Sequence, residues 1–539
     1  MIRHLGFAAW LAVAAVPSVS AQAHDHGPGE KLGRVVFPVS CNAEAQKRFE
    51  RSMALLHSFW WEQGSQAFAD VASADPTCAM AYWGSAMNAW GNPFGGGPSG
   101  TALANAGQAA ERAASLGGRT PREAGFTSAV ATLYRGFATV PNAVRLRAYS
   151  DTMARVYRDN PNDVEVAIYY ALSLVATAAA TDTTFVRQKQ AAAILNPLFQ
   201  RFPQHPGLAH YIIHANDSPR LAALGLDAAK RYAQIAPAAP HAQHMPSHIF
   251  IRLGLWEETV NSNRRSVDAG IAYARAQGAP GVSYHEFHAT DYMVYGYLQR
   301  GQDSAARSLV ADALAMPTGT MPGSILGGYN RTALQLRPAL ETGAWADAAR
   351  FPLPPELPAP AFEMLLRFAR GIGAARSGAT AQAKDEVAAL ERITQALASR
   401  NDAYWSRIAG IKRQAVQAWV LLAEGDTSGA LREAKAAADL EDVTEKHPVT
   451  PGELLPAREL EADMHFALGH FAAAAAAYHT ALQRERGRAR SAFGEARATE
   501  LAGDAGAAKA KYAEFLKLME QADGTRPEIA VARAAVATR

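Results

Sequence analysis

The sequence predicts an all-α protein in which helical hairpins repeat along the chain. Apolar residues recur at helical spacing almost throughout, and alanine is abundant while β-branched residues are sparse, a composition that favours helix. Glycine separates paired helical runs, as in LLAEGDTSGALREA and ELAGDAGAAKAKYAEF, and short turns of this kind join neighbouring helices. Together these observations predict a helical-hairpin solenoid whose hairpins stack into a superhelix.

The first 23 residues have the three parts of a secretory signal peptide. Arg3 supplies the positive start, residues 5–16 the apolar core, and Ala21-Gln22-Ala23 the cleavage site. The apolar core is too short to span a bilayer, and no later stretch is apolar for long enough to do so. We therefore expect no membrane span and a location in a bacterial periplasm or outside the cell.

Residues 24–43 contain Gly and Pro and lack a helical pattern, so we expect a flexible leader there. Cleavage after Ala23 would expose His24-Asp25-His26, whose amine and imidazole nitrogens suit Cu(II) or Ni(II). A polar leader that binds no metal is the favoured alternative, because cleavage after Ala21 removes this arrangement.

Cys41 and Cys78 are the two cysteines of the chain. In an exported protein an isolated pair indicates a disulfide first. Cys41 precedes the first expected helix and Cys78 opens the third, so a bridge would hold the first hairpin together. A metal site with cysteine ligands is the alternative.

The amino-terminal half repeats one pattern, in which a helix, a turn with glycine, a second helix and a terminating proline follow one another. The first repeat ends at Asp75-Pro76, and this order is typical of tetratricopeptide repeats. The helices expected in this half cover residues 43–61, 64–74, 79 onward, 101–116, 121–137, 143–158, 164–178 and 188–202.

The chain resembles exported bacterial tetratricopeptide-repeat proteins that carry the segments ADPTCAMAYWG, HYIIHA and HMPSHIF. The resemblance extends over residues 41–310, and the remainder matches only as generic repeats. It implies the helical-repeat fold and export, and it implies no particular catalytic activity.

Two irregular stretches interrupt the repeats. FPLPPELPAP, residues 351–360, is rich in proline, which disfavours helix, and it predicts a break between arrays at 44–350 and 361–539. NPFGGGPS, residues 92–99, lacks the Lys and Ser/Thr of a phosphate-binding loop and predicts a rim of the central groove instead.

Histidine is concentrated in the middle of the chain, where half of the 16 histidines lie between His205 and His288. Pairs at helical spacing put two imidazoles on one face of a helix, which is how a helix offers two ligands to one metal ion. The three pairs are His210 with His214, His244 with His248, and His285 with His288.

The intervals between these pairs match a repeat period. His244 follows His210 by 34 residues and His285 follows His244 by 41, which brackets the period of helical-hairpin repeats. We therefore expect each pair on the first helix of its own repeat, with all six imidazoles facing one concave groove.

Other residues are candidates to complete the site. His241 precedes the middle pair and is expected to contribute from the connecting loop, as a seventh ligand. The carboxylates, tyrosines and further histidine considered as extra ligands or as hydrogen-bond partners are Asp217, Glu286, Asp291, Tyr211, Tyr284, Tyr292, Tyr295, His447 and Glu453. His57 is expected to pack in the core, with support of the site as the alternative.

Seven imidazoles without thiolates suit a transition metal, with copper favoured and zinc next. They exceed the needs of one tetrahedral zinc and supply about three ligands to each of two ions. Two copper ions with three imidazoles each activate oxygen, whereas two zinc ions bridged by water favour hydrolysis. A proton relay or an anion-binding groove without metal is the alternative.

The overall composition narrows the function further. Charged residues are 19% and the net charge is +3, so nothing indicates a nucleic-acid surface. The sequence predicts a periplasmic metalloprotein, with a metal-dependent oxidoreductase as the indicated enzyme class and a peptide or small molecule as the ligand of the groove. The alternatives are a non-catalytic scaffold for protein partners and a metal carrier.

Overall fold

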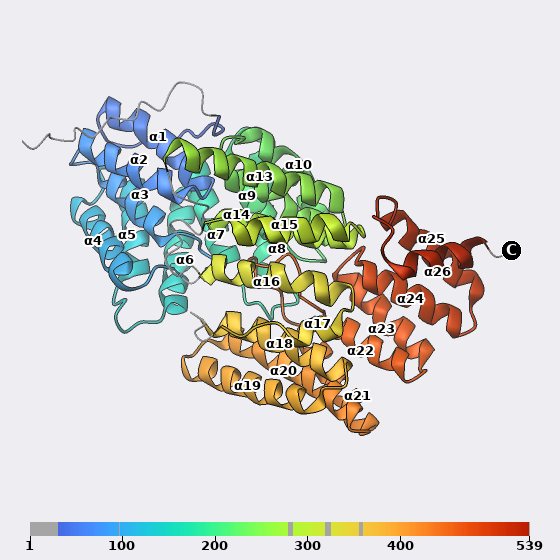
Figure 1. Cartoon of the computed structure of the whole chain (residues 1–539). Helices are drawn as coiled ribbons and strands as arrows, with labels where there is room; N and C mark the ends of the chain where they lie inside the picture. Colours follow the sequence, from blue (N-terminus) through green and yellow to red (C-terminus); the bar gives the residue numbers. More distant parts are fainter. Residues whose placement is uncertain (1–30, 96, 279–283, 318–324, 355–358, 538–539) are drawn as a thin grey trace, which may run out of the picture.

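The structure is a computed structural model and describes residues 31–95, 97–278, 284–317, 325–354 and 359–537. Within these ranges it consists of α-helices and one 3-10 helix, without strands, which confirms the all-α prediction (Figure 1). The repeated hairpins form the tetratricopeptide-like solenoid that the sequence predicts. The signal peptide and the segment His24-Asp25-His26 lie outside the described residues.

The helices of the amino-terminal part pair as successive hairpins. They are α1 (Ala43–His57), α2 (Trp61–Ala74), α3 (Ala79–Trp90), α4 (Gly100–Leu116), α5 (Pro121–Tyr134), α6 (Asn142–Asp159), α7 (Val164–Ala176) and α8 (Val186–Arg201).

The central helices carry the clustered histidines. They are α9 (Pro206–Asn216), η1 (Ala222–Gly225), α10 (Leu226–Ile235), α11 (Pro240–His244), α12 (Pro246–Leu253), α13 (Trp256–Ala276), α14 (Tyr284–Gln299), α15 (Asp303–Ala315), α16 (Ile325–Glu341) and α17 (Trp345–Ala349).

The carboxyl-terminal helices continue the array. They are α18 (Pro360–Arg376), α19 (Thr380–Ser399), α20 (Ala403–Ala423), α21 (Thr427–Asp442), α22 (Ala457–Ala467), α23 (Phe471–Arg484), α24 (Ala489–Leu501), α25 (Ala505–Leu518) and α26 (Pro527–Ala537).

Local chemistry sets many helix ends. Side chains of Asn42, Thr120 and Asp163 accept hydrogen bonds from backbone N–H groups in the first turns of α1, α5 and α7. Gly117 and Gly254 follow α4 and α12 in the left-handed conformation, which glycine adopts without steric cost. Because these signals are local, the boundaries follow closely from the sequence.

The first helix is shorter than predicted and ends at His57 rather than residue 61. Phe59 has a φ of 51°, so the chain leaves the helical path between α1 and α2. This early end leaves the His57 carbonyl without a helical partner and directs the Phe59 ring toward the central histidines.

Residues 31–42 are packed against the protein, in contrast to the predicted flexible leader. Leu32, Val35 and Phe37 are buried in the largest core, and the N–H of Arg34 donates to the Gln204 carbonyl at 2.9 Å. The segment carries enough apolar side chains to pack without forming a helix. The disulfide between Cys41 and Cys78 is confirmed, with the two Cα atoms 5.1 Å apart.

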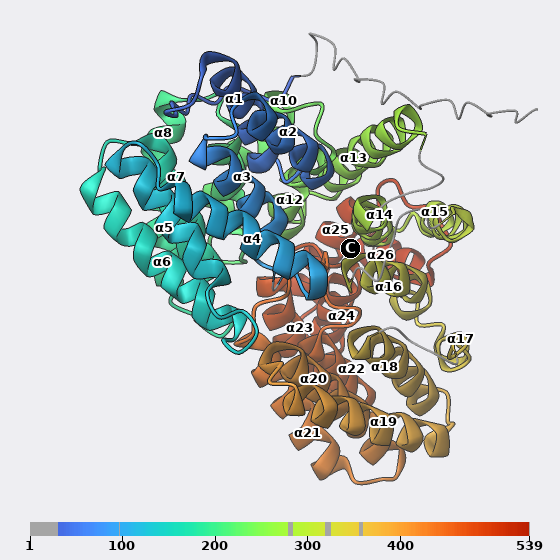
Figure 2. The same ribbon diagram turned by 90° about the vertical axis from the view of Figure 1, so that its left-hand side faces the viewer.

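The Pro-rich segment does not divide the core where the sequence predicts a break between arrays. Tyr329 and Leu336 of α16 share a hydrophobic core with Phe362 and Leu365 of α18. In Figure 1 the chain winds as a superhelix, with α13–α16 between the amino-terminal helices and the orange helices α18–α21. In the turned view of Figure 2, the orange helices lie below α4, and α13–α16 lie to the right of the amino-terminal helices. The described prolines of this segment, Pro352, Pro354 and Pro360, thus lie between α17 and the first turn of α18 without dividing the core.

The connection between α21 and α22, residues 443–456, folds back across the centre, and we call it the return loop. The N–H of Glu445 donates to the Ala180 carbonyl at 2.8 Å. The Pro448 carbonyl accepts from the Tyr292 hydroxyl at 2.9 Å, and the Val449 carbonyl accepts from the amide of Asn330 at 2.8 Å. These bonds join the carboxyl-terminal repeats to the helices that carry the histidines.

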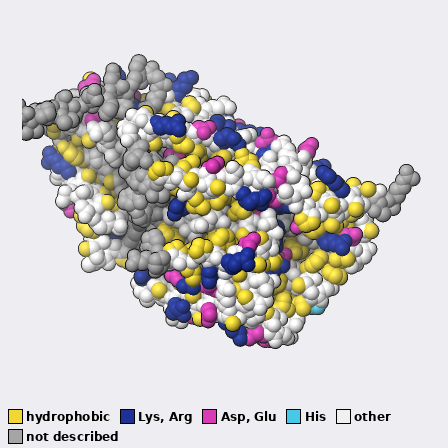
Figure 3. Space-filling model, viewed as in Figure 1, with side chains coloured by type: hydrophobic (Ala, Val, Ile, Leu, Met, Phe, Trp, Pro, Cys, Tyr) yellow, Lys and Arg dark blue, Asp and Glu magenta, His cyan; other side chains and the backbone are white. Residues whose placement is uncertain are grey.

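The surface shows no extended field of one charge among the described residues on the face in Figure 3, where basic and acidic side chains are interspersed. None of the described helices combines the length and the apolar character that crossing a bilayer requires.

Candidate metal centre

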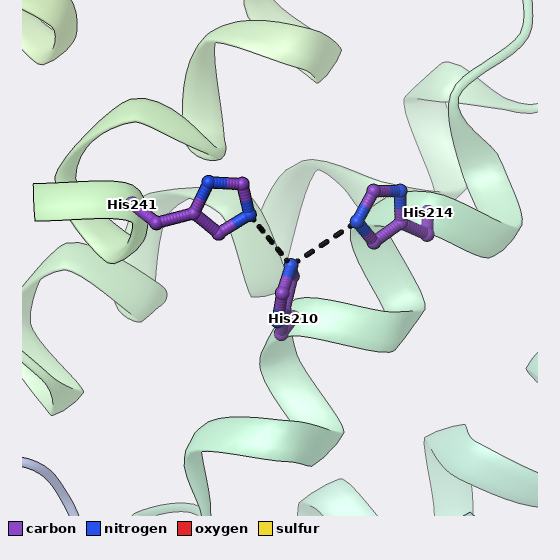
Figure 4. Close-up of side chains that lie close together, drawn as sticks. All are labelled: His210, His214 and His241. Carbon is purple, nitrogen blue, oxygen red and sulfur yellow. Dashed lines mark hydrogen bonds between the residues drawn. The ribbon is translucent and has the colours of Figure 1, made fainter. Parts of the chain in front are cut away.

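The first cluster joins His210 and His214 of α9 with His241 of α11. His210 Nε2 lies 3.1 Å from His214 Nε2 and 3.2 Å from His241 Nε2, and the three rings converge on one point (Figure 4). Pro206 and Pro240 open the two helices, at the position where a missing N–H has no cost. We call this set triad A.

The second cluster joins His244 and His248 with His288 of α14, and we call it triad B. The Nε2 atoms of His244 and His248 lie 3.0 Å apart. Pro246 separates the short helices α11 and α12, but Met245 between them keeps helical angles of −54° and −35°. The two histidines therefore retain the one-turn spacing that their sequence predicts.

Hydrogen bonds to Nδ1 fix how three of these rings are oriented. The Nδ1 of His210 donates to the His57 carbonyl at 2.6 Å, that of His244 to Asn263 Oδ1 at 2.5 Å, and that of His248 to the Asp217 carboxylate at 2.9 Å. In a neutral imidazole the other nitrogen then carries a lone pair. All three Nε2 atoms therefore face their triads as electron-pair donors.

The contact between His244 and His248 needs a positive charge. Both Nε2 atoms carry lone pairs, and at 3.0 Å these lone pairs repel each other. A proton on one ring would relieve the repulsion, but burial lowers the pKa of both rings. Two nitrogens bound to one ion at about 2.0–2.1 Å lie about 2.9–3.4 Å apart, so the spacing fits two ligands of one metal.

Burial keeps the imidazoles in the form that binds metal. Desolvation lowers the pKa of His210 to about 3 and lowers the pKa of His214 and His244 well below the usual range. The pKa values of His241 and His288 shift in the same direction for the same first cause. Because a metal ion competes with protons for these nitrogens, neutral rings favour binding at physiological pH.

The two triads adjoin each other. The ring centroids of His214 and His248 are 6.1 Å apart, and those of His241 and His244 are 5.9 Å apart. His210, His244 and His248 are at most 2% exposed. His241 and His288 are half-buried. The histidines therefore form one largely buried double cluster, whereas the sequence predicts that they face one concave groove.

His285 belongs to neither triad, although the sequence pairs it with His288. Its ring centroid lies 5.9 Å from that of His241. His241, by contrast, completes triad A as the sequence predicts from its place before the middle pair.

The carboxylates expected as further ligands have other partners. Asp217 accepts from His248 and from Arg252 Nε, each at 2.9 Å, so it orients a ring of triad B. Asp291 is fully buried against Arg337, whose Nε donates to it at 2.6 Å. Glu286 is buried and its carboxylate lies directly against Gly270 of α13. The side chain of Tyr284 lies outside the described residues.

The other tyrosines divide into two groups. Tyr292 lies beside triad B, with its hydroxyl 3.5 Å from His248 Nε2, and Tyr211 donates to His57 Nδ1 at 3.1 Å. Tyr295 instead donates to Glu485 at 2.7 Å and is not part of the cluster.

The return loop brings His447 near the centre without adding it to a triad. Its Nδ1 accepts from the N–H of Val449 at 3.1 Å, and burial lowers its pKa to about 4. Glu453 is held by Lys412 Nζ at 2.6 Å and does not contact the histidines of the triads.

A third cluster was not predicted from the sequence. Glu165 accepts from His57 Nε2 at 3.0 Å and from His205 Nε2 at 2.9 Å. Every ring nitrogen has a hydrogen-bond partner, because Tyr211 donates to His57 and the N–H of Leu208 approaches His205 Nδ1 at 3.4 Å. This cluster is complete without a metal and holds the residue whose carbonyl orients His210.

Aromatic rings cover triad A and were also missed. Phe59 packs on His210 with ring centroids 4.4 Å apart, and Phe94 packs on His214 at 4.3 Å. Phe94 belongs to the Gly-rich loop predicted to border the groove. Asn263 was missed as well, because a lone Asn on α13 carries no pattern that sequence reasoning detects.

A cavity of about 780 Å³ reaches triad A from the side of His214. Its walls come from the amino-terminal helices, from the return loop and from the helices α18–α20. It gives a small molecule a place to lie beside the histidines.

No protein-family model and no curated protein sequence matches the chain. Among solved structures, the human IFIT1 dimer with m7Gppp-AAAA has a TM-score of 0.34 and 12% identity, covering 78% of this chain and 87% of that chain. Yeast Tom70 has a TM-score of 0.32 and 10% identity, covering 91% of this chain and 95% of that chain. Structural similarities with TM-scores and identities this low do not indicate what the chain binds.

Proposed function

We propose that the protein is a metalloprotein that binds two transition-metal ions, one in each triad, and that the pair serves a metal-dependent oxidation. The contact that carries the proposal is the one between His244 and His248, whose lone pairs face each other at 3.0 Å in a buried site. A cation between them turns this repulsion into coordination.

Copper is the favoured ion and zinc the next. Each triad consists of imidazoles alone, and Asp217, the carboxylate bonded to a triad ring, is also paired with Arg252. Paired zinc sites for hydrolysis use a bridging carboxylate, whereas imidazole donors suit copper, which also stands highest in affinity among the divalent first-row metals.

Three ligands for each ion leave a coordination position open, which distinguishes a catalytic site from a saturated structural one. The chain's own contribution is to orient the rings through Nδ1 and to exclude bulk water by burial. The cavity beside His214 gives a reactant access to triad A. Metal storage alone would not need such a cavity.

Export to the periplasm or beyond is part of the proposal. The signal-peptide pattern of residues 1–23 supports it, and so does the disulfide between Cys41 and Cys78, because such bonds persist in oxidising compartments.

The test is elemental analysis of the exported protein, purified without a histidine tag. We expect about two copper ions per chain in the wild type and a loss of both in the double variant His214→Ala, His248→Ala. The matched control is His465→Ala, His470→Ala, a histidine pair with ring centroids 5.7 Å apart outside the triads, which should keep its metal. A folded wild type that takes up no metal after reconstitution would overturn the proposal and favour a scaffold for protein partners.

A further inference from the structure

The cavity beside triad A has an aromatic lining. Phe94, Phe185, Phe362, Tyr404, Trp405 and His447 are among its wall residues. They come from five separate parts of the chain, so the lining exists only when the amino-terminal helices, α18, α20 and the return loop are all in place. Flat apolar walls of this kind favour a ligand with an aromatic ring.

Two wall residues each have a polar atom without a partner. Gln188 Oε1 and Ser218 Oγ are both buried, and neither has a hydrogen-bond partner among the described residues. Ser218 is only 4% exposed. A buried polar atom without a partner costs about 1–3 kcal/mol. Because both atoms are closed off in this conformation, a ligand bonds to them and recovers this cost once the two side chains turn toward the cavity. The amide oxygen of Gln188 accepts only, so the ligand must present a donor such as a hydroxyl.

The charged groups in the wall beside His214 are paired. Asp217, Glu445 and Lys446 line the cavity, and Arg252 lies behind them, 2.9 Å from Asp217 and 3.2 Å from Glu445. Lys446 Nζ lies 3.9 Å from Asp217. The two carboxylates balance the two cations, so this part of the wall fits a neutral ligand better than a charged one.

The position of the cavity connects it to the proposed metal centre. His214 forms part of the wall, and Phe94, another wall residue, packs on the His214 ring with centroids 4.3 Å apart. A ligand in the cavity therefore lies against a residue of triad A.

We propose that this cavity binds a neutral hydroxylated aromatic molecule, with its hydroxyl on Gln188 and Ser218 and its ring among the aromatic walls. The further role of this molecule as the reactant of the metal pair rests on the proposed function. Binding itself depends only on the wall residues.

The test is equilibrium dialysis of 2-naphthol against the protein as purified, with the metal content of each sample measured in parallel. We expect saturable binding of one molecule per chain. Replacement of the acceptor in Gln188→Leu should weaken 2-naphthol binding by about tenfold or more and leave the binding of naphthalene, which lacks the hydroxyl, unchanged. Gln190→Leu, on the same helix but outside the cavity wall, is the matched control and should bind 2-naphthol like the wild type.

Equal binding of 2-naphthol to the wild type and Gln188→Leu would overturn the assignment of the hydroxyl. Equal binding of decahydro-2-naphthol, which has the hydroxyl without the aromatic ring, would overturn the aromatic assignment. If the protein holds metal but binds no 2-naphthol, the cavity proposal alone is wrong. If it binds 2-naphthol but never takes up metal, the metal proposal alone is wrong.

Discussion

The carboxylate of Asp217 accepts a hydrogen bond from Nδ1 of His248 at 2.9 Å, and this bond sets the direction of the opposite nitrogen. Burial raises the pKa of Asp217, but Lys446, Arg252 and His248 outweigh it and hold that pKa well below its usual range. At neutral pH the ring therefore faces an ionised partner. A carboxylate behind a metal-binding imidazole fixes the tautomer and makes the free nitrogen a stronger donor.

Asp217→Asn tests this support. The amide can still accept from His248, but the negative charge is lost while Arg252 and Lys446 remain beside it. We expect metal affinity at triad B to fall by about 10–100-fold, measured by competition with a chelator of known affinity. Asp227→Asn, which removes an exposed partner of Arg231, should leave the affinity unchanged. Unchanged affinity in Asp217→Asn itself would show that the carboxylate does not tune the ligand.

Glu165→Gln should affect triad A instead. Glutamine offers one acceptor oxygen where two imidazole N–H groups now donate, so one N–H of His57 or His205 loses its partner. We expect a loss of about 3 kcal/mol of stability and a shift of the His57 carbonyl that orients His210. Elemental analysis should then find about one metal ion per chain rather than two.

The control for this change is Glu111→Gln on α4, at an exposed position remote from the histidines. If Glu165→Gln retains both ions at wild-type affinity, the buried cluster has no influence on triad A.

His447 should make stability depend on pH. Burial, and then Lys446, lower its pKa in the folded protein to about 4, against about 6.5 in an unfolded chain. The unfolded state therefore binds the extra proton first, and stability is lost as the pH falls from about 6.5 toward 4. The full pKa shift corresponds to a loss of about 3 kcal/mol in the free energy of unfolding. Because His447 is partly exposed to the cavity, we expect a loss of about 1–3 kcal/mol.

The measurement is the urea midpoint at pH 7 and pH 5. His447→Asn keeps an acceptor for the N–H of Val449 and cannot titrate, so its midpoint should fall less than that of the wild type. His479→Asn, whose side chain is 59% exposed, should behave like the wild type. An equal fall in all three proteins would remove His447 as the cause.

The disulfide should stabilise the first hairpins. Cys41 and Cys78 close a loop of 37 residues. Closing such a loop lowers the entropy of the unfolded chain and thereby stabilises the folded state by about 4 kcal/mol. We expect Cys41→Ala, Cys78→Ala to unfold at lower urea than the wild type while it still binds metal, because neither residue contacts a triad. An unchanged midpoint would contradict this account.

The sequence predicts those parts of the structure that depend on local chemistry. The helices expected to begin at residues 43, 121 and 164 do begin there, each after a capping side chain, and His210 and His214, paired by their spacing, lie in one triad. The copper and zinc assignments, the signal peptide and the metal ligands themselves remain predictions.

Contacts between distant segments were beyond the reach of sequence patterns. His288 rather than His285 enters triad B because of how α14 packs against α11 and α12, which its spacing does not reveal. Asn263 and Glu165 act through partners on other helices, and the return loop depends on bonds to helices far away in the sequence.

The return loop changes how this solenoid is expected to unfold. Repeat proteins in which each hairpin contacts only its neighbours melt piece by piece from their ends. Here Tyr292 bonds to Pro448 across 156 residues of chain, and Glu445 bonds to Ala180. Such distant pairings couple the amino-terminal and carboxyl-terminal repeats thermodynamically and slow the search for the native state. We therefore expect a single cooperative transition and slow refolding, properties of a compact globular domain rather than of an open repeat array.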